Sequence, residues 1–355
     1  MIQHYQILCL FLLFTLSLTA QHAGNKYDKA HEKYDDATCP IPPGDVQHFV
    51  YFAKDRSALR GHPLLEHPRF AGAQIMYSWR ELETARDRYD FSTIRKDLAY
   101  LKKHGKKLFI QLQDATFYAK YDAVPRYLKS EEFGGGQAAQ YNDAGRQEGW
   151  VAKRWDPRVQ ARFARFLQAL GAEFDGEVAG VNLQETAIGV DATNDASFTS
   201  RKYLVGYKAN MLALTNAFPQ SDKMIYANFF PGEWLPWEDE GYLRELYRYG
   251  EEIGVGFGGP DLLFERRAQL NHILRLMHEG DYAVPLGIAI QDGNYVAKTG
   301  VGKDVDEADP SALQRRNIVP KLFHFANDFL RVDYMFWGNQ QPYFSALVLP
   351  CFAGG

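Results

Sequence analysis

Val178-Ala-Gly-Val-Asn-Leu-Gln-Glu-Thr-Ala-Ile-Gly189 is the stretch around which the rest of the sequence is organised. Its first part, Val178 to Leu183, is a short and mostly apolar run that is typical of a buried strand. The run ends in Gln184 and Glu185, and small residues follow. A carboxylate at the end of a buried parallel strand is held rigidly at the rim of a core. The alternative is a glutamate that only caps the next helix or pairs with an arginine.

Apolar runs of this kind recur along the chain and alternate with amphipathic stretches. Eight strands that alternate with helices predict a single-domain (β/α)8 TIM barrel with long loops at its C-terminal face, the face that carries the chemistry in this fold. An open doubly wound sheet is disfavoured because no Gly-x-Gly-x-x-Gly opens a helix after the first strand. The predicted strands are residues 48–53, 73–77, 107–113, 178–183, 224–228, 254–257, 284–290 and 333–337, and the predicted helices begin at Ser92 and Pro157 and span 200–217, 240–252, 265–279 and 311–330.

The N-terminus has the pattern of a secretory signal. Residues 1–20 contain an apolar run from Ile7 to Leu18, followed by small residues at a potential cleavage site, and the run is too short to span a bilayer. The residues before the run include no Lys or Arg, so an uncleaved anchor is the alternative. Residues 21–45 are expected to form an irregular arm, and residues 46–355 the barrel. We expect an exported monomer, periplasmic or extracellular, without stable membrane insertion after signal removal.

Two cysteines remain once the signal segment is set aside, Cys39 and Cys351. They lie near the two ends of the mature chain, and the termini of a closed barrel meet at its seam. An oxidising compartment allows such cysteines to pair. The sequence therefore predicts a disulfide that joins the N-terminal arm to the C-terminal tail.

Composition narrows the classes of partner. The net charge of −4 shows no basic bias and no Lys/Arg-rich run is present, so nucleic acid is not an expected partner. The chain is rich in aromatic residues (21 Tyr, 24 Phe and 6 Trp), many of them in predicted loops, where rings can stack on sugar faces. Core filling must account for at least half of them. The scattered histidines and the absence of a Gly-x-Ser-x-Gly elbow predict no metal, no cofactor and no serine nucleophile.

The segment Tyr77-Ser-Trp-Arg-Glu-Leu-Glu83, followed by Arg88-Tyr-Asp-Phe-Ser92 and His104-Gly-Lys, resembles glycoside hydrolase clan A, the retaining (β/α)8-barrel glycosidases. The resemblance spans roughly residues 46 to 345. It implies an acid/base glutamate at the end of the fourth strand, a nucleophile at the end of the seventh and a tryptophan at the end of the eighth. Glu185 and Trp337 match the first and last of these positions. Two such carboxyl groups, one protonated and one ionised, can straddle a glycosidic bond.

Two departures from the clan pattern stand out. The clan has Asn immediately before the acid/base, whereas this chain has Gln184. The clan nucleophile is Glu, whereas the seventh strand here offers only Asp292, preceded by Gln291. A shorter side chain retracts the carboxylate, and a wider gap can admit a water and change the outcome from retention to inversion.

The sequence thus predicts Glu185 as general acid/base and Asp292 as nucleophile or general base of an exported hydrolase that cleaves a poly- or oligosaccharide. Other carboxylates near strand ends, including Asp261, are expected to bind substrate hydroxyls or cap helices, and Arg80 to orient a carboxylate or form an ordinary salt bridge. A catalytically silent carbohydrate-binding barrel and a polysaccharide lyase are the alternatives. The residues expected to contact substrate are Trp79, Arg80, Asp114, Gln184, Asn228, Glu233, Trp234, Gln291, Tyr295 and Trp337.

Overall fold

A computed structural model describes residues 26–235, 237–270, 272–291, 293–298 and 316–353. Several sequence predictions therefore lie, wholly or in part, outside the described residues. They are the signal segment 1–20, the first residues of the arm expected at 21–45, residue 271 of the helix expected at 265–279, Asp292, the start of the helix expected at 311–330, and the last two residues of the region 46–355.

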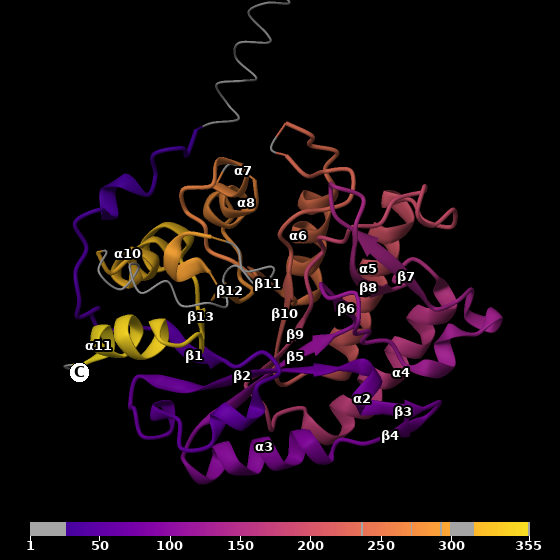
Figure 1. Cartoon of the computed structure of the whole chain (residues 1–355), viewed down its shortest axis with the longest axis horizontal. Coiled ribbons are helices and arrows are strands. Elements are labelled where there is room, and N and C mark those ends of the chain that lie inside the picture. The colour runs from indigo at the N-terminus through magenta and orange to yellow at the C-terminus, as the bar shows by residue number, and fades with distance from the viewer. Residues whose placement is uncertain (1–25, 236, 271, 292, 299–315, 354–355) are drawn as a thin grey trace, which may run out of the picture.

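Eight parallel strands close into a barrel in the order β1-β13-β12-β11-β10-β9-β5-β2. The strands follow one another around the barrel in chain order, and the first pairs with the last (Figure 1). The predicted (β/α)8 barrel is confirmed. The barrel strands are β1 (Gln47–Tyr51), β2 (Phe70–Ser78), β5 (Lys107–Gln113), β9 (Gly180–Leu183), β10 (Asp222–Tyr226), β11 (Gly256–Gly259), β12 (Leu286–Ile290) and β13 (Tyr334–Gly338).

Helices follow most of the barrel strands, and the two longest begin at side-chain capping groups. Asp156 accepts a hydrogen bond from the backbone N–H of Arg158 with Pro157 at the first helical position, and Thr199 caps the next helix through Lys202 N–H. The helix predicted at 265–279 is divided into two shorter ones. The helices are α2 (Trp79–Leu82), α3 (Ser92–Lys103), α4 (Pro157–Phe174), α5 (Ser200–Ala217), α6 (Tyr242–Ile253), α7 (Arg267–Leu270), α8 (Ile273–Glu279), α10 (Val319–His324) and α11 (Leu349–Phe352), with π-helical turns at Phe325–Leu330 and Phe344–Val348 and short 3-10 turns at Glu32–Tyr34, Arg56–Leu59, Pro63–Leu65, Arg126–Lys129, Glu131–Phe133 and Asn294–Val296.

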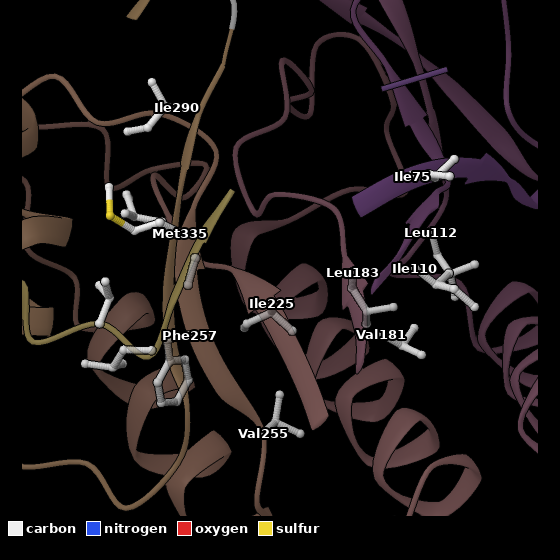
Figure 2. Close-up of a cluster of buried hydrophobic side chains, with 14 of the residues drawn as sticks. Ile75, Ile110, Leu112, Val181, Leu183, Ile225, Val255, Phe257, Ile290 and Met335 are labelled. Atoms are coloured by element: carbon white, nitrogen blue, oxygen red, sulfur yellow. The ribbon is translucent and has the colours of Figure 1, made fainter. Parts of the chain in front are cut away.

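Alternate residues of each strand face the barrel interior and the surrounding helices, as the period of two requires. The outward side chains join the large core between strands and helices, and Figure 2 shows several of them on neighbouring strands, among them Val181 and Leu183 of β9. The interior holds a separate cluster that includes Phe109 of β5 and Phe336 of β13, whose ring centroids are 5.0 Å apart. The barrel interior is therefore filled by side chains and is a packed core rather than a pore.

The long connection between β5 and α4 is more ordered than an irregular loop. It contains a three-stranded antiparallel sheet of β6 (Ala115–Thr116), β8 (Gln147–Ala152) and β7 (Gln137–Tyr141). A second small pair, β3 (Glu83–Ala85) with β4 (Arg88–Tyr89), follows α2. The three-stranded sheet extends the C-terminal face of the barrel, where strand-end side chains lie.

Cys39 and Cys351 form the predicted disulfide, across a separation of 312 residues. The same two segments are joined by a backbone hydrogen bond of 2.9 Å from Ile41 N–H to the Cys351 carbonyl. The arm contributes to the core as well, since Tyr34 is buried. Within the described part of the chain, no helix is both long and apolar enough to cross a membrane.

Candidate active site

Glu185 lies just past the end of β9, at the mouth of the barrel, and is partly buried. Its Oε2 accepts a hydrogen bond of 2.7 Å from Nδ2 of Asn228, which follows the neighbouring strand β10. The Asn228 side chain is itself fixed, because its Oδ1 accepts from the backbone N–H of Ala187 at 3.2 Å. Two adjacent strand ends thus hold one carboxyl group in a defined position.

The environment of Glu185 favours its protonated form. Burial raises the pKa of this carboxyl group to about 8, although the hydrogen bond from Asn228 and the charge of Arg154 act in the opposite direction. The nearby carboxylates of Asp261 and Glu148 raise the pKa further. At neutral pH the group therefore mostly carries a proton, which is the state that a general acid requires.

The predicted substrate ligand Asp114 forms a buried ion pair with Arg154. The guanidinium donates from Nε to Oδ2 at 2.7 Å and from Nη2 to Oδ1 at 2.6 Å, and both side chains are almost fully buried. Arg154 Nη1 donates in addition to the backbone carbonyl of Glu185 and to the hydroxyl of Tyr203, each at 2.8 Å. Asp114 therefore supports the backbone of Glu185 through Arg154, and both of its oxygens are engaged within the protein.

Gln184, which stands where clan A has asparagine, also has a supporting position. Its Oε1 accepts hydrogen bonds from the backbone N–H groups of Asp114 and Ala115, at 3.1 and 2.9 Å. Its own carbonyl accepts from the hydroxyl of Tyr207. The longer amide thus ties the end of β9 to the end of β5.

A groove leads away from Glu185 between the β7–β8 hairpin, the β9–α5 loop and the loop after β10. Two adjoining cavities of about 450 and 570 Å³ make up this feature, which we call the loop groove. Such volumes fall in the range of roughly 300–1,000 Å³ that is usual for ligand sites. Residues shared by both cavities are Tyr141, Asn142, Asp143, Ile188, Gly189 and Trp234, and the cavity that also contains Ala187 is lined in addition by Phe117, Glu148 and Arg266.

The loop after β10 separates two residues that were both expected to contact substrate. Trp234 is 39% exposed and lines the loop groove. Glu233 is 1% exposed, and its Oε2 accepts from the backbone N–H of Tyr242 at the start of α6 while its Oε1 lies 3.3 Å from His272 Nε2. Glu233 is therefore a buried helix cap, and only Trp234 is available to a ligand.

Three predicted aromatic contacts are buried within the protein. Trp337 lies on the outward face of β13, because Phe336 before it faces the interior, and its Nε1 donates to His48 Nδ1 at 3.1 Å. Trp79 begins α2 and donates to Glu83 Oε2 at 2.8 Å, and the hydroxyl of Tyr295 donates to the carbonyl of Gly338 at 2.9 Å. None of the three is more than 3% exposed, so these side chains do not form a sugar-binding surface in this structure.

Arg80 forms a salt bridge with Asp122, with 2.8 Å between Nη1 and Oδ2. This is the ordinary salt bridge that the sequence leaves open as the alternative to orienting a carboxylate in the site. Gln291 follows β12 and is partly exposed, and its backbone N–H donates to Asn294 Oδ1. Asn294 also donates to Asp261 Oδ1 at 2.9 Å, which orients the carboxylate that acts on Glu185. The predicted partner of Glu185, Asp292, lies outside the described residues.

Several residues of the site could not be recognised from the sequence. Arg154 and Arg266 come from loops and Glu148 from the short strand β8, and no motif marks them. Their only sequence signal is that Glu148 and Arg154 fall in the long connection after β5, whose length was itself unusual. Among the described residues, no group of three or more His, Cys, Asp or Glu side chains is arranged to hold a metal ion.

Comparison with known proteins supports the fold and goes no further. No protein-family model matches the sequence, and no curated protein matches it. The catalytic domain of β-amylase from Paenibacillus polymyxa is similar in structure, with a TM-score of 0.53 and 10% sequence identity over 88% of this chain and 95% of that one. Endo-glycoceramidase II from Rhodococcus sp., in a complex with a cellobiose-like isofagomine, is similar with a TM-score of 0.50 and 12% identity over 86% of this chain and 77% of that one.

Proposed function

We propose that this protein is an exported glycoside hydrolase that cleaves a poly- or oligosaccharide with Glu185 as its general acid/base. The observation that carries the proposal is the position of Glu185, a carboxyl group at the mouth of a (β/α)8 barrel that Asn228 holds in place and whose pKa is raised by burial to about 8. A strand-end glutamate that served only as a cap or an ion-pair partner would be held in its charged form. Here the nearest hydrogen-bond donor is a neutral amide.

The geometry explains how Glu185 would act. Asn228 occupies Oε2, so Oε1 can carry the proton that passes to the glycosidic oxygen as the leaving group departs. Arg154 holds the Glu185 backbone, which fixes the carboxyl group relative to the barrel. The same group, now ionised, would then take a proton from the water that completes the reaction if the mechanism is retaining.

A second carboxylate must attack the anomeric carbon or activate a water. We assign this role to Asp292 on the sequence argument that it follows the seventh barrel strand, across the mouth from the fourth. The separation of the two carboxyl groups decides the outcome, since about 5–5.5 Å favours retention and roughly 6.5–9.5 Å favours inversion. The shorter Asp favours the wider gap.

Three further observations support the proposal. The two similar solved structures named above are a β-amylase and an endo-glycoceramidase, and the chain shares their fold. The loop groove provides an aromatic-lined site beside Glu185. The disulfide between Cys39 and Cys351 is typical of proteins outside the reducing cytosol, which supports export.

The test is product analysis with a panel of bacterial and plant polysaccharides. Wild-type protein, Glu185→Gln and Asp292→Asn are incubated with each polymer, and reducing ends and near-ultraviolet absorbance are followed together. A hydrolase releases reducing ends without new absorbance, and both variants lose that release. Products that absorb in the near ultraviolet would instead establish a lyase, and binding without any product would establish a silent barrel.

A further inference from the structure

The loop groove is continuous with the site of Glu185. Ala187, two residues after the carboxyl group, lines the groove, and its backbone N–H donates to the same Asn228 that holds Glu185. Glu148 in the groove wall is also close enough to raise the pKa of Glu185. A chain bound at Glu185 can therefore extend into the groove.

The wall of the groove is firmly built. Tyr141 N–H donates to the carbonyl of Gly189 at 2.8 Å, and Gly189 N–H donates to the buried side chain of Gln140 at 3.0 Å. A Cβ at position 189 would lie 2.2 Å from the Tyr141 carbonyl oxygen, so only glycine allows the hairpin and the loop to approach this closely. The groove is thus a preformed feature of the described structure.

Charged groups line the groove without ion-pair partners among the described residues. The carboxylate of Glu148 and the guanidinium of Arg266 each lack a hydrogen bond or salt bridge there, although Arg266 lies over the ring of Phe229 at 5.4 Å. The pKa of Glu148 is raised by burial and by neighbouring Asp143. Glu148 is partly buried, so its carboxylate is costly to leave without a partner and a ligand hydroxyl group would satisfy it, whereas Arg266 is exposed and offers donors to a ligand.

Aromatic rings supply the apolar part of the groove. Trp234 is partly exposed and stacks near Phe229, with centroids 6.4 Å apart and planes inclined by 27°. Tyr141 and Phe117 line the same cavity as Trp234. A broad ring held at a fixed tilt beside acceptors and donors suits the C–H face of a sugar, whose hydroxyl groups then point at the charged side chains.

The excess of negative charge in the groove lining limits the class of ligand that can bind there. Carboxylates in the groove lining outnumber cations, since the two cavities are lined by Asp143, Glu148 and Asp191 and by one guanidinium, that of Arg266. The nearby Glu185 becomes a further negative charge whenever it ionises. A uronate or sulfate group at this position would be repelled, whereas neutral hydroxyl groups would find both acceptors and donors.

We propose that the loop groove is a subsite for sugars that carry no carboxylate or sulfate, with Trp234 as stacking surface and Glu148 as hydroxyl acceptor. The inference rests on the proposed function, because it takes the ligand to be the glycan chain that extends from Glu185. It goes further by naming the substrate class: neutral polysaccharides rather than polyuronates or sulfated polymers.

The experiment measures binding separately from turnover. Full-length Glu185→Gln is run through native gels that contain neutral polymers (glucan, xylan, mannan, galactan and starch) or anionic ones (polygalacturonate, alginate and carrageenan). At least one neutral polymer should retard the protein, and the anionic polymers should not. Adding Trp234→Ala should weaken retention about tenfold or more, a loss of about 1.4 kcal/mol. Trp234→Phe should preserve much of it, because a ring remains.

Matched controls separate the groove from the general surface. Trp237 is 73% exposed and lines neither cavity, so Trp237→Ala should leave binding unchanged. Glu148→Gln should weaken retention, whereas Glu131→Gln at an exposed position outside the groove should not. Retention by anionic polymers alone, retention by none, or equal loss in Trp234→Ala and Trp237→Ala would overturn the subsite. Turnover that does not depend on Trp234 would refute the subsite but not the proposed hydrolase. Binding that depends on the groove, without any turnover, would refute the hydrolase but not the subsite.

Discussion

Asn228 donates a hydrogen bond of 2.7 Å to Glu185, from the end of one barrel strand to the end of the next. The bond is from a neutral amide to a carboxyl group whose pKa is about 8. It orients the group without forcing it to ionise. The relationship leads to direct predictions about protonation, stability and activity.

The first prediction concerns the two neighbours that shift the Glu185 pKa in opposite directions. Asn228 favours the ionised form, so Asn228→Ala should move the pKa of Glu185 above about 8. Asp261 favours the protonated form, so Asp261→Asn should move it below that value. Carboxyl ¹³C chemical shifts measured against pH, with Glu185→Gln used to assign the signal, report both movements. Shifts in the same direction for the two variants would contradict this electrostatic picture.

The second prediction links the same group to stability. The folded-state pKa of about 8 lies above the ordinary value of 4.5, so folded protein binds more protons than unfolded protein between these limits. Stability from this group is fully present below pH 4.5 and is lost as the pH rises toward 8. As the pH rises through this range, the free energy of unfolding of wild type should therefore fall relative to that of Glu185→Gln, with a slope that approaches about 1.4 kcal/mol per pH unit. Urea melts of both proteins across this range give the difference, and a difference independent of pH would refute the raised pKa.

The third prediction concerns the ion pair of Asp114 with Arg154. Both side chains are buried, so Asp114→Asn leaves a guanidinium in the interior without its counter-charge. We expect a loss of about 3–5 kcal/mol in unfolding free energy. Asp122→Asn is the matched control, because Asp122 pairs with the more exposed Arg80 and Lys129 and the loss of these pairs should cost about 1 kcal/mol or less. Equal effects of the two substitutions in urea melts would mean that Asp114 does not hold the site together.

The fourth prediction concerns the disulfide between Cys39 and Cys351. It links residues that are 312 positions apart in the sequence, so replacing both cysteines by serine should lower the free energy of unfolding by about 2–4 kcal/mol. The barrel should remain folded, because its strands pair around the closed sheet independently of the arm. Denaturant melts compare the double variant with wild type in oxidising and reducing buffer. A wild-type protein indifferent to reduction would contradict the expectation.

The strands and the position of Glu185 could be predicted from the sequence, because apolar runs and their polar ends are local signals. Trp337 shows that local sequence signals do not predict which way a side chain of a fully apolar strand faces. It lies in an entirely apolar run, Tyr334-Met-Phe-Trp, in which no alternation tells the inward face from the outward one. The structure places Phe336 inward and Trp337 outward, so the match with the clan position does not give a sugar contact.

Asp114 illustrates a second limit. Its strand-end position suggested a ligand for substrate, but its partner Arg154 lies 40 residues away in a loop and is brought to it only by the fold. Glu233 behaves likewise, since its role as a cap depends on α6 nine residues later. Tertiary partners of buried carboxylates carry no periodic signal, so sequence patterns place such groups at the rim without showing what they bind.

The most direct test of the central claim compares sugar release by wild type and Glu185→Gln on the most rapidly cleaved polymer, from pH 5 to pH 9. Wild type should lose activity as the pH rises through about 8, where the acid gives up its proton. Glu185→Gln should be slower by roughly 10²–10⁴-fold at every pH, the usual contribution of a general acid. A Glu185→Gln protein that releases sugar at the wild-type rate would contradict the account.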